Sequence, residues 1–145
     1  MPKASHSSDV AKTIKIKEKC YLQLLAWSMS YNEVGFICAG RNDCIVSVFR
    51  IKNASQTTRH RYVWDRKQRS EVLTAISKKE LVVLAEGHSH PHPRHLRRPS
   101  REDIDYFKHG IPHIIVFPCE SEIRGWILGN KMFKAKNAQI QIVVI

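Results

Sequence analysis

The chain has 145 residues, of which 43% are hydrophobic and 26% are charged. This length and composition fit one globular domain and exclude an intrinsically disordered chain. The net charge of +11, from 24 Lys and Arg against 13 Asp and Glu, favours an acidic partner without choosing among nucleic acid, a membrane surface and an acidic protein. No apolar run approaches the ~18–20 residues that span a bilayer, and the N-terminus lacks the apolar segment of a secretory signal. We therefore expect a soluble, cytoplasmic protein with no membrane partner.

The N-terminal part predicts a leader, a strand and a helix. Residues 1–11 are polar and lack periodicity, so we expect a flexible leader, with the folded domain spanning 12–145. The segment TIKIKEK, residues 13–19, alternates apolar and charged side chains, which is the period of a strand. From about residue 18 to residue 31 the apolar side chains recur at helical spacing, which predicts an amphipathic helix.

Two short apolar runs, residues 35–40 and 44–51, flank the turn sequence GRND and predict a β-hairpin. The four cysteines show no CxxC spacing, so in an intracellular chain we expect them to be reduced and packed as small apolar residues. Cys38 and Cys44 lie on either side of the turn. A disulfide between them is left open, although the compartment argues against it.

The remaining elements alternate between helices and strands. In order they are a helix with Asp65 as N-cap, a strand at 81–90, a helix from Ser100 to Gly110, a strand at 113–118, a hairpin over 122–135 with Gly129-Asn130 at its tip, and a strand at 139–145. No repeats interrupt this order. The pattern predicts a single domain of the α/β (α+β) class, with a curved mixed sheet flanked by helices.

The segment GHSHPHPRHLRRPSRED, residues 87–103, carries the chemistry. His88 and His90 are two residues apart at the end of a strand, so both imidazoles leave the same face and can converge on one ion. Ser89, on the opposite face, is expected to orient its neighbours rather than react. Asp103 falls in the first turn of the next helix and offers a third ligand. Two histidines and one aspartate leave a tetrahedral zinc with one open position, which is the geometry of catalytic rather than structural sites.

Other interpretations of the same residues remain open. Ser100-x-x-Asp103 is also a capping-box pattern, and a His-x-His pair at a strand end is also a common surface feature. Four further histidines, His92, His95, His109 and His113, add patterns that look like ligands. Spacing alone does not decide between a zinc site and a polar surface.

The motifs taken together resemble the JAMM family of metalloproteases, also called MPN-plus or JAB1/MPN, in its stand-alone prokaryotic type. The resemblance rests on His88-Ser89-His90-Pro91, then Ser100-x-x-Asp103, with an upstream glutamate in NEVGFICAG. That glutamate, Glu33, is similar to the first residue of the family's Glu-x-x-Gly segment, with Gly35 displaced by one. The order of elements over residues 13–145 also matches, and it implies the MPN fold, which is cytidine-deaminase-like.

The resemblance implies a role for each motif residue. His88, His90 and Asp103 would bind one Zn²⁺ per chain, Glu33 would be the general base for water activated by that zinc, and Ser100 would donate a hydrogen bond to the oxyanion. The implied activity is hydrolysis of the isopeptide or peptide bond after the C-terminal tail of ubiquitin or a ubiquitin-like protein, including the sulfur-carrier type. A ubiquitin-like partner, often acidic, would suit the positive charge.

One segment departs from the family's pattern. Nine residues separate His90 from Ser100, where seven are common in the family. Arg94, Arg97 and Arg98 in this longer loop are candidates for binding an acidic substrate, and a solvated loop explains them equally well.

Two alternatives to the enzyme remain. Catalytically silent MPN domains act as assembly scaffolds, but they typically lack the ligand set that this chain carries. Nucleic-acid binding fits the charge, yet the three tryptophans, Trp27, Trp64 and Trp126, are not interleaved with basic residues in any recognised motif. The sequence leaves homodimerisation open.

Overall fold

The computed structural model describes residues 10–57, 61–92, 97–107, 110–127 and 138–145. Its elements in chain order are β1 (Val10–Ile16), α1 (Glu18–Ser28), β2 (Gly35–Arg41), β3 (Cys44–Ile51), α2 (Arg66–Lys78), β4 (Val82–Ser89), α3 (Arg101–Phe107), β5 (His113–Phe117), a short 3₁₀ helix (Pro118–Glu120), β6 (Glu122–Ile127) and β7 (Ala138–Val144). Helices thus alternate with strands, as the sequence predicts.

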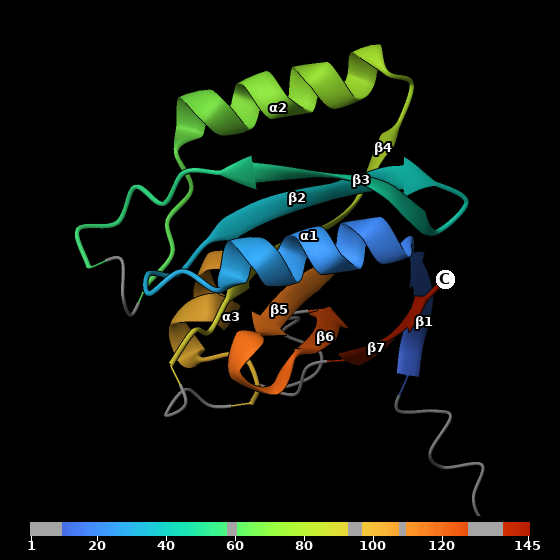
Figure 1. Ribbon diagram of the computed structural model, residues 1–145. Coiled ribbons are helices and arrows are strands. Elements are labelled where there is room, and N and C mark those ends of the chain that lie inside the picture. The colour runs from blue at the N-terminus through green and yellow to red at the C-terminus, as the bar shows by residue number, and fades with distance from the viewer. Residues whose placement is uncertain (1–9, 58–60, 93–96, 108–109, 128–137) are drawn as a thin grey trace, which may run out of the picture.

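The seven strands form one mixed sheet that closes on itself. Their order is β1-β3-β2-β4-β5-β6-β7, and β7 pairs back to β1. The β1–β7 and β4–β5 pairs are parallel, whereas β2 runs antiparallel to both β3 and β4. The predicted single α/β domain with a curved mixed sheet is confirmed, and the curvature is strong enough to close the sheet. Figure 1 shows α2 and α1 on opposite sides of the β2–β3 hairpin, with α3 near the end of β4.

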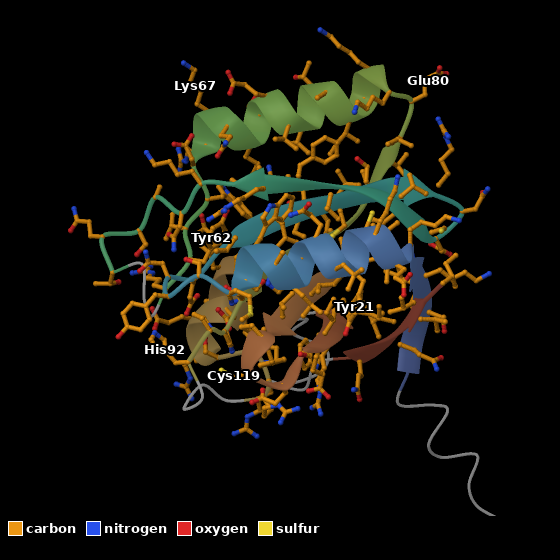
Figure 2. The ribbon with its side chains drawn as sticks, in the orientation of Figure 1. Tyr21, Tyr62, Lys67, Glu80, His92 and Cys119 are labelled. Carbon is orange, nitrogen blue, oxygen red and sulfur yellow. The ribbon has the colours of Figure 1, made fainter. Side chains whose placement is uncertain are left out.

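Local chemistry explains the ends of several elements. Asn42 and Asp43, with φ of 52° and 58°, form the two-residue turn between β2 and β3, which is the left-handed backbone that a tight hairpin needs. Asp65 caps α2 as predicted, because its Oδ1 accepts the Gln68 N–H at 2.9 Å. Lys67 and Glu80 project into solvent from α2 and from the turn just after it (Figure 2).

The sheet has an apolar cluster on each face. The cluster under α1 contains Cys20 and Leu24 of that helix together with Ile14, Ile16, Phe36, Cys38, Ile45, Leu84, Ala85, Ile114, Val116 and Ile140. The cluster under α2 and α3 contains Ile76 and Phe107 of those helices together with Ile37, Ala39, Ile51, Tyr62, Ile115, Phe117 and Trp126. Aromatic rings gather in the second cluster, and this is the face that carries the histidines of the β4 motif.

Some predicted boundaries need correction. β1 begins at Val10, inside the predicted leader, and ends at Ile16 rather than Lys19, because Glu18 already begins α1. The helix predicted to run from Ser100 to Gly110 begins at Arg101 and is described to Phe107, and residues 108–109 before Gly110 lie outside the described residues. The first strand of the predicted 122–135 hairpin is β6, which pairs with β7, and the predicted Gly129-Asn130 tip lies outside the described residues. The rest of the predicted leader, residues 1–9, also lies outside them.

The cysteines are free thiols. Cys38 faces Val48 across the hairpin and Cys44 faces Arg41, so the disulfide that the sequence left open does not form. Burial raises the pKa of the Cys38 thiol, which keeps it protonated and unreactive. Separately, no helix in the described part of the chain combines the length and the hydropathy that a membrane crossing needs.

Candidate metal centre

His88 and His90 leave the C-terminal end of β4 on the same face of the sheet. His88 is opposite Gly35 of β2 and Ile115 of β5, so it lies in the middle of the sheet. His90 follows the last residue of the strand, and its N–H still donates to the Val116 carbonyl at 2.9 Å. Both side chains are buried, at 0% and 6% exposure. The strand therefore gives both imidazoles fixed positions, as the two-residue spacing predicts.

Asp103 reaches the two histidines from the first turn of α3. Its Oδ2 accepts the Ser100 N–H at 2.9 Å, and its own N–H donates to Ser100 Oγ at 3.0 Å. These two bonds form a reciprocal cap at the start of the helix. Asp103 is thus both a capping residue and a candidate ligand, and the cap holds its carboxylate in place.

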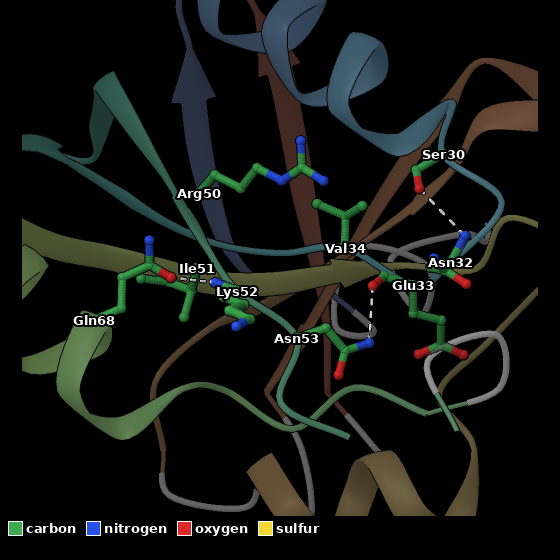
Figure 3. A pocket seen from close by; sticks show the side chains of 9 residues that line it. All are labelled: Ser30, Asn32, Glu33, Val34, Arg50, Ile51, Lys52, Asn53 and Gln68. Atoms are coloured by element: carbon green, nitrogen blue, oxygen red, sulfur yellow. Dashed lines mark hydrogen bonds between the residues drawn. The ribbon is translucent and has the colours of Figure 1, made fainter. Parts of the chain in front are cut away.

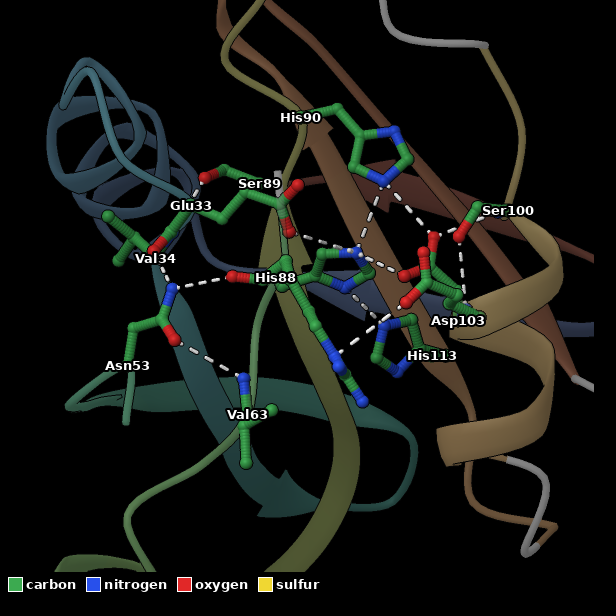
Figure 4. Close-up of polar contacts among 12 residues, drawn as sticks. Glu33, Val34, Asn53, Val63, His88, Ser89, His90, Ser100, Asp103 and His113 are labelled. Carbon is green, nitrogen blue, oxygen red and sulfur yellow. Dashed lines mark hydrogen bonds and ion pairs between the residues drawn. The ribbon is translucent and has the colours of Figure 1, made fainter. Parts of the chain in front are cut away.

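The three side chains converge (Figure 4). His88 Nε2 lies 3.2 Å from His90 Nε2 and 3.0 Å from Asp103 Oδ1, and His90 Nε2 lies 3.1 Å from Asp103 Oδ2. Ligands of a tetrahedral zinc, at 2.0–2.1 Å from the ion, are about 3.3–3.4 Å apart. The observed separations are close to that value, and two imidazoles with one carboxylate are a donor set that zinc commonly takes. The described residues thus contain a group that could hold a metal ion.

The charges in this cluster are strongly coupled. Burial alone would raise the pKa of the Asp103 carboxyl, but the charge and hydrogen bonds of His88 and His90 hold that pKa well below its usual range. The carboxylate is therefore ionised at neutral pH, which is the form that binds a cation.

Glu33 lies beside the triad on the segment between α1 and β2. Its Oε1 is 3.9 Å from His88 Nε2, and the side chain is 4% exposed. Burial raises the pKa of Glu33 to about 8; the charge of His90 lowers it and that of Asp103 adds to the rise. The predicted upstream glutamate is therefore near the predicted ligands, although 54 residues separate Glu33 from His88.

Side chains from distant segments hold the Glu33 segment in place. The Asn53 amide donates to the Glu33 carbonyl at 2.9 Å and to the Arg61 carbonyl at 2.8 Å. Ser89 Oγ accepts the Val34 N–H at 2.9 Å, and the Ser89 N–H donates back to the Val34 carbonyl at 2.9 Å. Ser89 therefore ties the Glu33 segment to β4, in agreement with the orienting role expected for it.

A cavity of about 310 Å³ lies on the main-chain side of Glu33 (Figure 3). Ser30, Asn32, Arg50, Lys52 and Asn53 are among the residues that line it. Figure 3 shows the Glu33 carbonyl facing Asn53 and the Glu33 carboxylate directed away from Arg50. The cavity thus adjoins the backbone of this segment, while the carboxylate faces the triad.

The three candidate arginines have different surroundings. Arg94 lies outside the described residues, and Arg98 is exposed. Arg97 forms an ion pair with Glu122, approaches Glu120 at 3.7 Å and lies over the Phe117 ring at 5.6 Å. Arg97 therefore anchors the end of the longer loop to β6, which accounts for it without a substrate.

No role could be assigned to His113 or to the aromatic rings around it from the sequence alone. His113 Nε2 lies 2.7 Å from His88 Nδ1, and both residues are fully buried. The Phe107 ring stacks on His88 at 5.4 Å between centroids, and Tyr62 stacks on the same imidazole at 6.3 Å. The sequence shows only that His113 begins an apolar strand, and this does not distinguish a histidine at a functional site from any other buried histidine.

Comparison with known proteins gives a consistent result. Residues 18–129 match the family model of prokaryotic homologs of the JAB domain. The solution structure of protein DSY2949 from Desulfitobacterium hafniense is similar, with a TM-score of 0.78 and 20% identity over 91% of this chain and 92% of that one. The crystal structure of AF2198, a JAB1/MPN domain protein from Archaeoglobus fulgidus, is similar with a TM-score of 0.57 and 20% identity over 90% and 98% of the two chains. No curated protein sequence matches the chain. At these identities the structural likeness shows the fold, and it confirms the predicted MPN type.

Proposed function

This chain belongs to the family of prokaryotic JAB-domain homologs, and from that membership we propose that it is a zinc-dependent isopeptidase or peptidase. Its substrate would be the amide bond after the C-terminal tail of ubiquitin or of a ubiquitin-like protein. One observation carries the proposal. A glutamate on a segment far away in sequence lies 3.9 Å from a His-His-Asp cluster whose donor atoms are 3.0–3.2 Å apart, close to the separation in a tetrahedral zinc site.

His88, His90 and Asp103 are the residues that would hold the metal ion, because their donor atoms lie 3.0–3.2 Å apart, with His88 facing Oδ1 and His90 facing Oδ2 of the carboxylate. Zinc in such a site supplies Lewis acidity, which polarises an amide carbonyl and lowers the pKa of water. Three protein ligands leave one coordination position, as in hydrolytic rather than structural sites.

Glu33 would move the proton. A base this close to the triad is placed to take a proton from the attacking water and to pass it to the nitrogen of the leaving amine. A cation bound at the triad would favour the charged form of Glu33 and lower its pKa from the value of about 8 that burial produces. The carboxylate would then be available as a base at neutral pH.

Ser100 and the basic loop would contact the substrate. The Ser100 oxygen accepts the Asp103 N–H, which leaves the hydroxyl proton to donate to the carbonyl oxygen of the scissile bond. A fixed donor at a developing oxyanion contributes about 3–4 kcal/mol in comparable hydrolases. Arg94 and Arg98 remain candidates for an acidic partner, and Arg97 is a weaker candidate because of its ion pair with Glu122.

The test pairs metal analysis with hydrolysis of a panel of ubiquitin-like conjugates, including those of the host. We expect about one zinc per chain in the wild-type protein. Glu33→Gln should keep that zinc and lower turnover by about 10²–10⁴-fold, the usual contribution of a general base. His88→Ala should lose the zinc, since it removes one of the three ligands.

A folded wild-type protein that takes up no zinc would contradict the proposal. Dimerisation without metal uptake would favour the scaffold alternative. Zinc uptake without cleavage of any conjugate in the panel would leave a metal-binding domain and contradict the ubiquitin-like substrate.

A further inference from the structure

His113 contacts the candidate ligand His88 from the neighbouring strand. The two imidazoles meet through His88 Nδ1 and His113 Nε2, which are 2.7 Å apart, a distance that requires a hydrogen bond between them. Both side chains are 0% exposed, so water does not compete for this contact. From the sequence alone, His113 could not be distinguished from the other histidines near the motif that look like ligands.

The direction of this hydrogen bond decides which nitrogen of His88 can bind a cation. A neutral imidazole carries one N–H and one lone pair. For His88 to offer Nε2 to the triad, its proton must be on Nδ1, and the atom facing that proton is His113 Nε2. Metal-binding histidines generally have such a partner for the second nitrogen, most often a carboxylate, a carbonyl or water. Here the partner is another imidazole.

The fold gives His113 little freedom to move. It is the first residue of β5, opposite Glu86 in the parallel β4–β5 pair, and the Glu86 N–H donates to the Pro112 carbonyl at 2.9 Å. The Phe107 ring lies 4.1 Å from the His113 ring between centroids and also stacks on His88. Strand pairing and one aromatic ring thus hold both imidazoles in a single arrangement.

The same geometry argues against His113 as a ligand itself. Its Nε2 faces His88 Nδ1, on the side of the His88 ring away from the triad. Within the described part of the chain, the residues whose donor atoms cluster within 4.8 Å of one another are His88, His90 and Asp103. His113 therefore acts on the site only through His88.

We propose that His113 is a positioning residue that keeps the proton of His88 on Nδ1 and so leaves His88 Nε2 to bind the metal ion. The inference rests on the proposed function, because it presumes that the triad binds metal. It goes further by naming a residue that sets metal affinity without touching the ion. Loss of an outer partner of this kind weakens metal binding by about 10–100-fold in other proteins.

The experiment compares His113→Leu with His113→Gln. The leucine removes the acceptor at roughly the same volume, whereas the glutamine can place its side-chain oxygen near the position of His113 Nε2. We expect the leucine variant to bind Zn²⁺ about 10–100-fold more weakly in competition with a chromophoric chelator, and the glutamine variant to bind close to the wild-type affinity. The visible spectrum of the Co²⁺-loaded protein should change in the leucine variant and be retained in the glutamine variant.

Leu24→Ala is the control for packing, because Leu24 is buried in the apolar cluster under α1, on the opposite face of the sheet from both imidazoles. It should lower the thermal midpoint while leaving zinc affinity and the Co²⁺ spectrum nearly unchanged. Wild-type zinc affinity in folded His113→Leu, or equal losses of affinity in the leucine and glutamine variants, would overturn the role of His113 but not the proposed function. A wild-type protein that binds no zinc would overturn the proposed function instead.

Discussion

The triad and Glu33 lie together in the site, but the fold holds them in different ways. His88 is fixed by strand pairing on both sides, and Asp103 is fixed by the cap of α3. The donor atoms of the triad therefore follow directly from regular secondary structure. Glu33 has no such support, because it lies between the end of α1 at Ser28 and the start of β2 at Gly35.

Side-chain hydrogen bonds take the place of regular structure around Glu33. Its carbonyl is held by Asn53, 20 residues away in the sequence, and the next residue, Val34, is held by Ser89, 55 residues away. Metal affinity should therefore depend on regular secondary structure, whereas the position of the base depends on side-chain hydrogen bonds. Mutations should therefore separate metal binding from turnover.

Gly35→Ala should have the largest effect on stability, because Gly35 is opposite His88 of the triad and two residues after Glu33. A Cβ at this position would lie 1.8 Å from Cζ of Tyr62, whose ring is buried and stacked on His88. We expect a loss of about 3 kcal/mol in the free energy of unfolding, at the upper end for an overpacked core. Chemical denaturation of the metal-free protein measures it.

Gly125→Ala is the control for this substitution. Its Cβ would meet Ile142 Cδ1 at 3.2 Å and Ile140 Cβ at 3.3 Å, so these neighbours need to move much less than Tyr62 does at Gly35. We expect a much smaller loss of stability. Equal losses in the two variants would show that Tyr62 does not constrain Gly35.

Asn53→Ala should lower turnover without changing zinc affinity. The substitution removes the amide that holds the Glu33 carbonyl and leaves the triad untouched. Turnover should fall by about 100-fold, since a displacement near 1 Å of a catalytic group has this effect. Zinc affinity should stay at the wild-type value.

Steady-state kinetics and chelator competition on the same preparations test this expectation. Thr57→Ala is a matched control on the same connection, since its hydroxyl contacts Ser55 Oγ at the surface. Equal losses of zinc affinity and turnover in Asn53→Ala would mean that the triad and the position of Glu33 are not independent.

The same difference explains how much could be predicted from the sequence. The triad was visible as a candidate because His-x-His and Ser-x-x-Asp are local patterns whose geometry follows from a strand end and a helix start, and the family resemblance then decided between a zinc site and a polar surface. Glu33 was identified only through a family resemblance. Asn53 was missed because it lies in a polar connection without periodicity, and its partners at Glu33 and Arg61 are defined only by the fold.

Element types were predicted more successfully than their boundaries. β1 is shifted by three residues because Glu18 begins α1, and alternation of apolar and charged side chains does not show where one element gives way to the next. The ion pairs of Arg97 could not be predicted either. Glu120 and Glu122 are more than 20 residues away in the sequence, and only the fold brings the segment after β5 next to Arg97.

Glu122→Gln should have the smallest effect, and it tests whether the loop anchor matters to the triad. Burial would raise the pKa of Glu122, but hydrogen bonds and charge from Arg97 and Arg124 lower it below its usual range. A lowered pKa means that the ionised carboxylate stabilises the fold above the unfolded-state value near 4.3, and that this contribution is lost as the pH falls. The two side chains are 46% and 33% exposed, so the contribution should be small and screened by salt.

Thermal unfolding of wild-type and Glu122→Gln proteins at pH 7 and below pH 4, each at low and high salt, would measure this difference. We expect a slightly lower midpoint for the variant at pH 7 and low salt, and no difference at low pH or high salt. Zinc affinity should be unchanged, although Arg97 lies over Phe117 and the Phe117 ring contacts His90 edge-on at 5.5 Å between centroids. If zinc affinity falls in Glu122→Gln as far as it does in His113→Leu, the triad depends on the loop anchor as well as on strand and helix, and the contrast with Glu33 fails.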